Sequence, residues 1–194
     1  LKPGGRDPPY VPTNADAKSA AESLADGAMY NTGQSCCSVE RIYAHESVYD
    51  AFVDALLAAS TRRRIGNPFD SDVDLGPVVN EAAATRIRGD IEEAERKGAM
   101  VALGGWNPND LPMTYVPATV LLNVNHNMRI MKEETFGPVA SVMKVKSDEE
   151  AISMMNDSGY GLTASIFSKD LESALALGER IECGSFAVNH CNYP

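Results

Sequence analysis

The stretch Asn31-Thr32-Gly33-Gln34-Ser35-Cys36-Cys37 lies between a helical pattern over residues 16–29 and a strand pattern over residues 39–43. Gly33 permits a sharp exit from the helix, and the small residues Ser35 and Cys37 let a ligand approach the backbone. A thiol in such a turn becomes a good nucleophile where dipoles, backbone N–H groups or cations favour its thiolate. On these residues alone Cys36 is a candidate nucleophile, and the commoner role of a cysteine, a small core side chain, is the other interpretation.

Outward from this turn, helical and strand patterns alternate along the whole chain. The expected helices cover residues 16–29, 47–59, 80–98, 147–155 and 171–181, and the expected strands cover 39–43, 100–103, 115–122, 138–145, 163–167 and 185–188. This alternation predicts βαβ crossovers and an α/β fold, with a mostly parallel sheet and helices on both faces. No repeat, low-complexity tract or internal linker interrupts the pattern, so we expect one domain over residues 1–194.

Composition excludes several classes of function. The formal net charge of −10 argues against a protein that binds the phosphate backbone of nucleic acids, which needs a basic surface. No apolar stretch approaches the ~20 residues needed to cross a membrane. The four cysteines, two of them adjacent, do not form a disulfide pattern, so reduced thiols in the cytoplasm or an organelle matrix are expected. His45, His126 and His190 are scattered, and their spacing predicts no metal site.

A second motif, Glu134-Thr135-Phe136-Gly137-Pro138, follows Cys36 after about a hundred residues. Alone, it fits a solvated pair of glutamates that leads into a Gly-Pro turn and a core phenylalanine. Together, the two motifs resemble the NAD(P)-dependent aldehyde dehydrogenase superfamily. The cysteine signature of that family is Gly-Gln-x-Cys with an arginine five residues further on, which Gly33, Gln34, Cys36 and Arg41 match. Its Glu-x-Phe-Gly-Pro motif matches residues 134–138.

The resemblance implies a reaction and a set of site residues. Cys36 would attack the aldehyde carbon, and the aldehyde would leave as a carboxylic acid after passing through a thiohemiacetal and a thioester. Glu134 would accept hydrogen bonds from the nicotinamide ribose of NAD or NADP, and Phe136 would pack near the nicotinamide. Ser35, Cys37 and Asn189 would belong to the substrate pocket. Members of the family act on small-molecule aldehydes and form homo-oligomers when full length.

The chain also departs from the family pattern. Gly4-Gly5-Arg6-Asp7-Pro8 resembles the family's Gly-Gly-Lys-x-Pro segment, and most members carry a general-base glutamate two residues before it. Lys2 stands at that position, and a cationic lysine does not readily accept a proton. A genuine substitution and an effect of where the chain was cut are both open interpretations.

The 194 residues contain neither the family's N-terminal dinucleotide-binding domain nor its C-terminal oligomerisation strand. We therefore expect the catalytic domain of a larger enzyme, inactive or weakly active by itself. Two alternatives stay open. The first is a CoA-acylating aldehyde dehydrogenase, in which a thiol releases the product and the glutamate is not required. The second is a catalytically impaired domain of the same fold, with an interaction or structural role.

Overall fold

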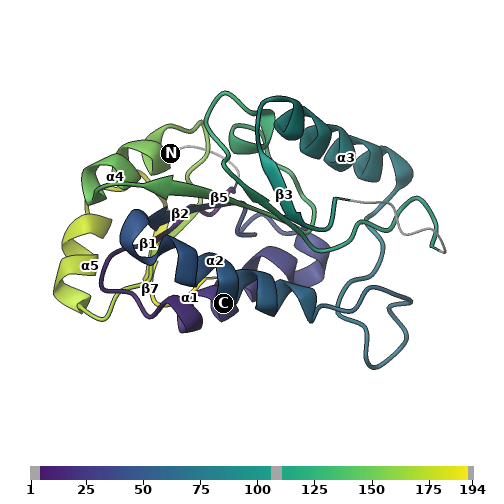
Figure 1. Ribbon diagram of the computed structural model, residues 1–194, viewed down its shortest axis with the longest axis horizontal. Coiled ribbons are helices and arrows are strands. Elements are labelled where there is room, and N and C mark those ends of the chain that lie inside the picture. The colour runs from purple at the N-terminus through teal and green to yellow at the C-terminus, as the bar shows by residue number, and fades with distance from the viewer. Residues whose placement is uncertain (1–4, 106–110, 192–194) are drawn as a thin grey trace.

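The computed structural model describes residues 5–105 and 111–191, and its strands form one seven-stranded sheet in the order β3-β4-β5-β2-β1-β6-β7 (Figure 1). The strands are β1 (Pro9–Val11), β2 (Arg41–His45), β3 (Met100–Leu103), β4 (Thr119–Leu122), β5 (Val139–Val145), β6 (Thr163–Ile166) and β7 (Ser185–Val188). All neighbours pair in parallel except β3 and β4, which are antiparallel at one edge of the sheet. The predicted mostly parallel sheet is confirmed.

Helices cover both faces of the sheet, as predicted (Figure 1). They are α1 (Ala17–Met29), α2 (Glu46–Thr61), α3 (Glu81–Arg96), α4 (Asp148–Asn156) and α5 (Leu171–Gly178). Because side chains alternate along a strand, Ile42 and Ala44 of β2 join the core beneath α1 and α2, whereas Tyr43 joins the core beneath α3, α4 and α5. The apolar residues of β4 divide between the two cores in the same way.

Polar side chains cap the starts of four helices. Asp16, Asn80 and Asp170 each accept a hydrogen bond from the backbone N–H three residues later, at the first turns of α1, α3 and α5. Ser147 does the same for α4, whose Glu150 carboxylate accepts from the Lys146 N–H at 2.7 Å. These side-chain contacts fix where α1, α3, α4 and α5 begin.

Sheet topology brings three sequence segments to one place. β1, β2 and β5 are adjacent and parallel. The segments that lead into them, residues 5–8, 36–40 and 134–138, must therefore meet at the edge formed by the amino ends of the strands. Ligands of open parallel sheets usually bind at the opposite, carboxyl edge. The two motifs of this chain converge at the amino edge instead.

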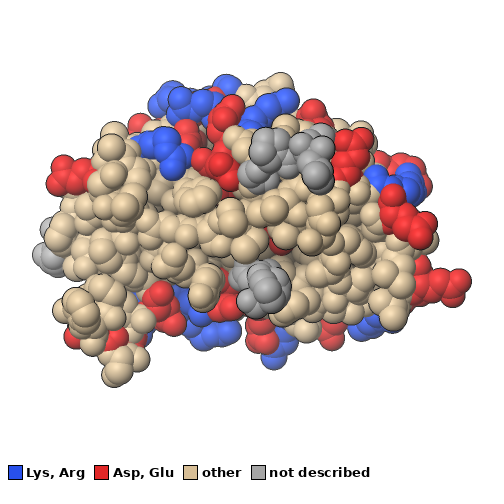
Figure 2. Space-filling model, turned by 180° about the vertical axis from the view of Figure 1, so that it is seen from behind, with Lys and Arg blue, Asp and Glu red and all other residues tan. Residues whose placement is uncertain are grey.

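Charged side chains are unevenly distributed over the surface. Figure 2 shows one face with a broad uncharged band across its middle, and the charged residues of both signs lie mainly along the rims. This face carries no continuous basic surface of the kind that nucleic-acid binding needs. Across the described ranges, every helix is too short or too polar to span a bilayer.

Candidate active site

The cysteine turn begins with an unusual backbone. After α1 ends, Asn31, Thr32 and Gly33 have positive φ angles of 50°, 58° and 69° in succession. Positive φ is rare for a β-branched residue such as Thr32, and residues held in this way cluster at functional sites. The left-handed turn reverses the chain, so that Cys36 lies just before β2 at the amino edge of the sheet.

The four thiols differ in how accessible they are. Cys36 is exposed, Cys37 and Cys183 are half-buried, and Cys191 is buried; none is paired in a disulfide. Burial raises the pKa of Cys191 to about 12, against a weaker opposing hydrogen bond from Ser23. Burial also raises the pKa of Cys183. A thiol whose pKa is raised is a poor nucleophile at neutral pH, so Cys36 is the best placed of the four to react.

The two motifs contact each other through glycine backbone. A Cβ atom on Gly33 would lie 2.0 Å from the Gly137 carbonyl oxygen, and one on Gly5 would lie 1.2 Å from the Cys36 carbonyl oxygen. Both positions require glycine because no side chain fits. The Gly5 N–H donates to the Glu134 carboxylate at 3.0 Å. Glu134 is therefore tied to a residue that packs directly on Cys36, and the nucleophile and the second motif form one site.

Gln34 anchors the cysteine turn to the loop before α3. Its side-chain oxygen accepts from the Val79 N–H at 2.8 Å, and its Nε2 donates to the Pro77 carbonyl at 3.4 Å. The glutamine of the first motif therefore holds the turn in place.

Glu134 and Phe136 line a cavity of about 450 Å³. The lining residues are Arg86, Asp90, Arg129, Glu133, Glu134, Phe136 and Tyr160. A carboxylate offers about four acceptor sites, so Glu134 keeps the capacity to bind a diol after accepting from Gly5. The half-buried Phe136 adds an aromatic surface. These groups suit a ligand with hydroxyl groups next to a flat ring.

Two site residues escaped sequence reasoning, the buried ion pair of Glu40 and Arg6. The Glu40 carboxylate is 2 % exposed, accepts from Arg6 Nε at 2.9 Å, and also accepts from the backbone N–H groups of Thr135 and Phe136. One signal was present, because Glu40 is the only acidic residue in the run Val39–Tyr43, and a charge in a buried strand needs partners. The arginine of the first motif, Arg41, is also buried, and it donates to the Tyr43 hydroxyl at 3.2 Å.

A family model described as "Aldehyde dehydrogenase family" matches residues 1–193. The chain belongs to the aldehyde dehydrogenase family. The expected family is confirmed, and the match covers both motifs and the segments that lead into β1, β2 and β5.

Relatives and solved structures of the family agree with this assignment. Lactaldehyde dehydrogenase of Escherichia coli is 39% identical over 194 residues, which are 100% of this chain and 40% of that protein. Its crystal structure superposes with a TM-score of 0.94 over 100% of this chain and 41% of that chain. NADP-dependent glyceraldehyde-3-phosphate dehydrogenase from Bacillus halodurans C-125, complexed with NADP, is 35% identical with a TM-score of 0.91, over 100% of this chain and 40% of that one.

Betaine aldehyde dehydrogenase from Staphylococcus aureus, in complex with NAD+, is 32% identical with a TM-score of 0.93, over 100% of this chain and 39% of that one. The chain spans about two fifths of the length of the curated relatives that it matches. Their activities therefore describe proteins more than twice as long.

The structure brings most of the predicted site residues together. Ser35, Cys36 and Cys37 form the turn, with the Ser35 hydroxyl 3.3 Å from the Cys37 sulfur. Glu134 and Phe136 lie beside this turn, across the glycine contacts. Lys2 lies outside the described residues. In the ranges 5–105 and 111–191, no group of three or more His, Cys, Asp or Glu side chains is placed to hold a metal ion.

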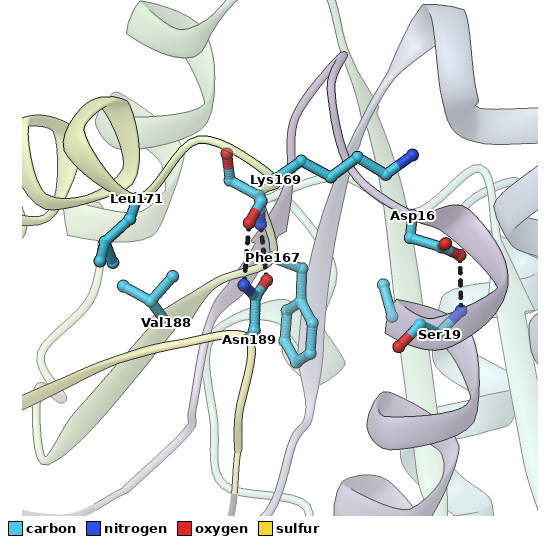
Figure 3. Close-up of a pocket in the computed structure, with 9 residues that line it drawn as sticks. Asp16, Ser19, Phe167, Lys169, Leu171, Val188 and Asn189 are labelled. Atoms are coloured by element: carbon cyan, nitrogen blue, oxygen red, sulfur yellow. Dashed lines mark hydrogen bonds between the residues drawn. The ribbon is translucent and has the colours of Figure 1, made fainter.

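Asn189 lies apart from this group. It follows β7 and Phe167 follows β6, so both lie at the carboxyl edge of the sheet, opposite Cys36. Figure 3 shows the Asn189 amide bonded to the backbone of the residue before Lys169, and the two bonds, to the N–H and carbonyl of Ser168, are both 2.8 Å long. The cavity that it lines, about 470 Å³, also borders Asp16 and the start of α1. The assignment of Asn189 to the substrate pocket stays a prediction. Its two hydrogen bonds to Ser168 link the segments that follow β6 and β7.

Proposed function

We propose that this chain is the catalytic-domain part of a larger enzyme that oxidises a small-molecule aldehyde to a carboxylic acid with NAD or NADP. The observation that carries the proposal is an exposed thiol at Cys36, in a turn held by glycine contacts beside the Glu134 carboxylate. Such an enzyme needs reduced thiols, which agrees with a cytoplasmic or organelle-matrix location. As in its family, the full-length protein would form a homo-oligomer.

The chemistry begins at sulfur. The Cys36 thiolate adds to the carbonyl carbon of the aldehyde, and the carbonyl electron pair moves to oxygen. The Cys36 backbone N–H has no acceptor among the described residues, so it can donate to this oxyanion. Loss of hydride from the adduct leaves a thioester on Cys36, and water cleaves it to the acid and the free thiol. One aldehyde and one water give one acid, one hydride and one proton, and that proton leaves when the Cys36 thiol returns to thiolate.

The cavity lined by Glu134 and Phe136 suits the hydride acceptor. NAD or NADP supplies the oxidised nicotinamide that takes up the hydride. Glu134 would hold the hydroxyls of the adjoining ribose, and Phe136 would bound the ring on one side. Most of the remaining contacts to the cofactor would come from a dinucleotide-binding domain outside these 194 residues.

Release of the thioester has two candidate routes. Lys2 stands where most family members carry the glutamate that activates water. A lysine at this position is compatible with a CoA-acylating enzyme as a second candidate, because a thiol can attack the thioester without that base. A catalytically impaired interaction domain is a third reading, which the exposed Cys36 and the intact Glu134 contact argue against.

The test joins this chain to the dinucleotide-binding domain of a relative and follows NAD reduction with simple aldehydes. Cys36→Ser should reduce the rate by about 10³-fold or more, whereas Cys37→Ser, the matched control, should retain most of it. Equal rates for the two variants would refute Cys36 as the nucleophile. Added CoA separates the release routes, because a CoA-acylating enzyme needs it, whereas Lys2→Glu should accelerate a hydrolytic one.

A further inference from the structure

Two side chains hold the Glu134–Phe136 segment by its backbone. The Glu40 carboxylate accepts from the Thr135 N–H at 2.9 Å and from the Phe136 N–H at 2.9 Å. The Arg86 guanidinium donates to the carbonyls of Glu134 and Thr135, at 2.8 Å each. Donors and acceptors of three consecutive residues are thus fixed by two side chains. Phe136, in the segment held by these hydrogen bonds, has a positive φ of 47°, a conformation that needs support from its surroundings.

Glu40 can do this only as a charged carboxylate. Its two oxygens take three N–H donors, because Arg6 Nε also donates at 2.9 Å. The other end of the Arg6 side chain donates to the Ile130 carbonyl. Burial raises the pKa of Glu40, and Arg6 together with the two backbone N–H groups opposes that rise. A neutral amide of the same shape would offer one acceptor oxygen and would turn an N–H toward another donor.

The position of this group links it to the nucleophile. Glu40 lies four residues after Cys36, just before β2, and Arg6 follows Gly5, which packs on the Cys36 carbonyl. The far end of the held segment, Gly137, packs against Gly33 of the cysteine turn. A buried ion pair placed elsewhere would serve the fold alone. Here, the pair connects all three segments that meet at the amino edge of the sheet.

We propose that Glu40 is a positioning residue, which fixes the Glu134–Phe136 segment relative to Cys36 and so sets where the nicotinamide end of the cofactor binds. The inference rests on the proposed function for the role of Glu134 and Phe136. The mechanical part, that Glu40 holds the segment, does not depend on it.

The test measures backbone amide hydrogen exchange by NMR in this chain, with Glu40→Gln and Glu40→Asp as variants. Tyr10→Phe is the matched control, because it removes one part-buried hydrogen bond, from the Tyr10 hydroxyl to Asp148 at 2.6 Å, away from the segment. Relative to this control, and after correction for global stability, Glu40→Gln should speed exchange at Thr135 and Phe136 about 10- to 100-fold. Glu40→Asp, which keeps the charge on a shorter side chain, should give an intermediate increase.

Exchange at Thr135 and Phe136 that is no faster in Glu40→Gln than in Tyr10→Phe would overturn the proposal. If Glu40→Gln does not fold, the same comparison between Glu40→Asp and Tyr10→Phe decides it. The comparison of Cys36→Ser with Cys37→Ser succeeds or fails independently of amide exchange. Failure of the proposed function and failure of this inference therefore give different results.

Discussion

Asp7 predicts a loss of stability as pH rises. Its side chain is 2 % exposed, Oδ1 has no hydrogen-bond partner, and its neighbours across a small cavity include Ala164 and Phe186. Burial raises the pKa of Asp7 from 3.8 to about 7, and the charge of Arg41 opposes the rise only in part. The folded chain therefore keeps a proton on Asp7 over a range of pH in which the unfolded chain has lost it.

The size of the effect follows from the two pKa values. They lie about 3 pH units apart, and each unit corresponds to about 1.4 kcal/mol. Protonated Asp7 therefore contributes about 4 kcal/mol to the free energy of unfolding at low pH. This contribution is fully present below pH 3.8 and is lost as pH rises through about 7. Between about pH 5 and about pH 8 the loss amounts to roughly 2.5 kcal/mol.

The assay is urea unfolding of the wild-type chain and of Asp7→Asn, followed by circular dichroism at several pH values. Asparagine has nearly the same shape and does not titrate, and all other titrations are shared. The free energy of unfolding of the variant should therefore rise, relative to that of the wild type, by roughly 2.5 kcal/mol from about pH 5 to about pH 8. A difference that stays constant, or a wild type that gains with rising pH, would show that Asp7 is ionised in the fold and paired with Arg41.

Two further predictions concern backbone contact and a histidine. Gly5→Ala should lower the free energy of unfolding by about 3 kcal/mol, because its Cβ would lie 1.2 Å from the Cys36 carbonyl oxygen; an unchanged urea midpoint would contradict this contact. Burial lowers the pKa of His126, and the Asp157 carboxylate opposes this by accepting from Nδ1 at 2.6 Å. Asp157→Asn should therefore lower the pKa of His126 further in an NMR titration, and a higher value would be inconsistent with the hydrogen bond.

Most of the fold was predictable because its elements have strong local patterns. The five helices carry apolar residues at helical spacing and capping residues at their starts. Strand β1 was missed because it is three residues long and begins with Pro9, which cannot donate to a neighbouring strand. The apolar run 115–122 predicts a longer strand than β4, which starts only at Thr119, after Pro117.

The site was predictable only in part. Periodicity places Cys36 and Glu134 before two strands but does not say that those strands are neighbours; the family resemblance implied only that both residues serve one reaction. A local pattern marks Glu40 as a charge that needs partners, but the partners Thr135 and Phe136 lie more than ninety residues further along the sequence, so no local pattern could identify them. Asn189 follows a strand end just as Cys36 precedes a strand start, and only the parallel sheet shows that these are opposite edges.

The most direct test of the account is the order in which the four thiols react. The folded chain is treated with limiting iodoacetamide, and alkylation at each cysteine is followed by peptide mapping. Cys36 should be modified well before Cys37, Cys183 and Cys191, because it is the exposed thiol of the turn. Labelling that reaches another cysteine first, or that leaves Cys36 unmodified, would contradict its assignment as the nucleophile.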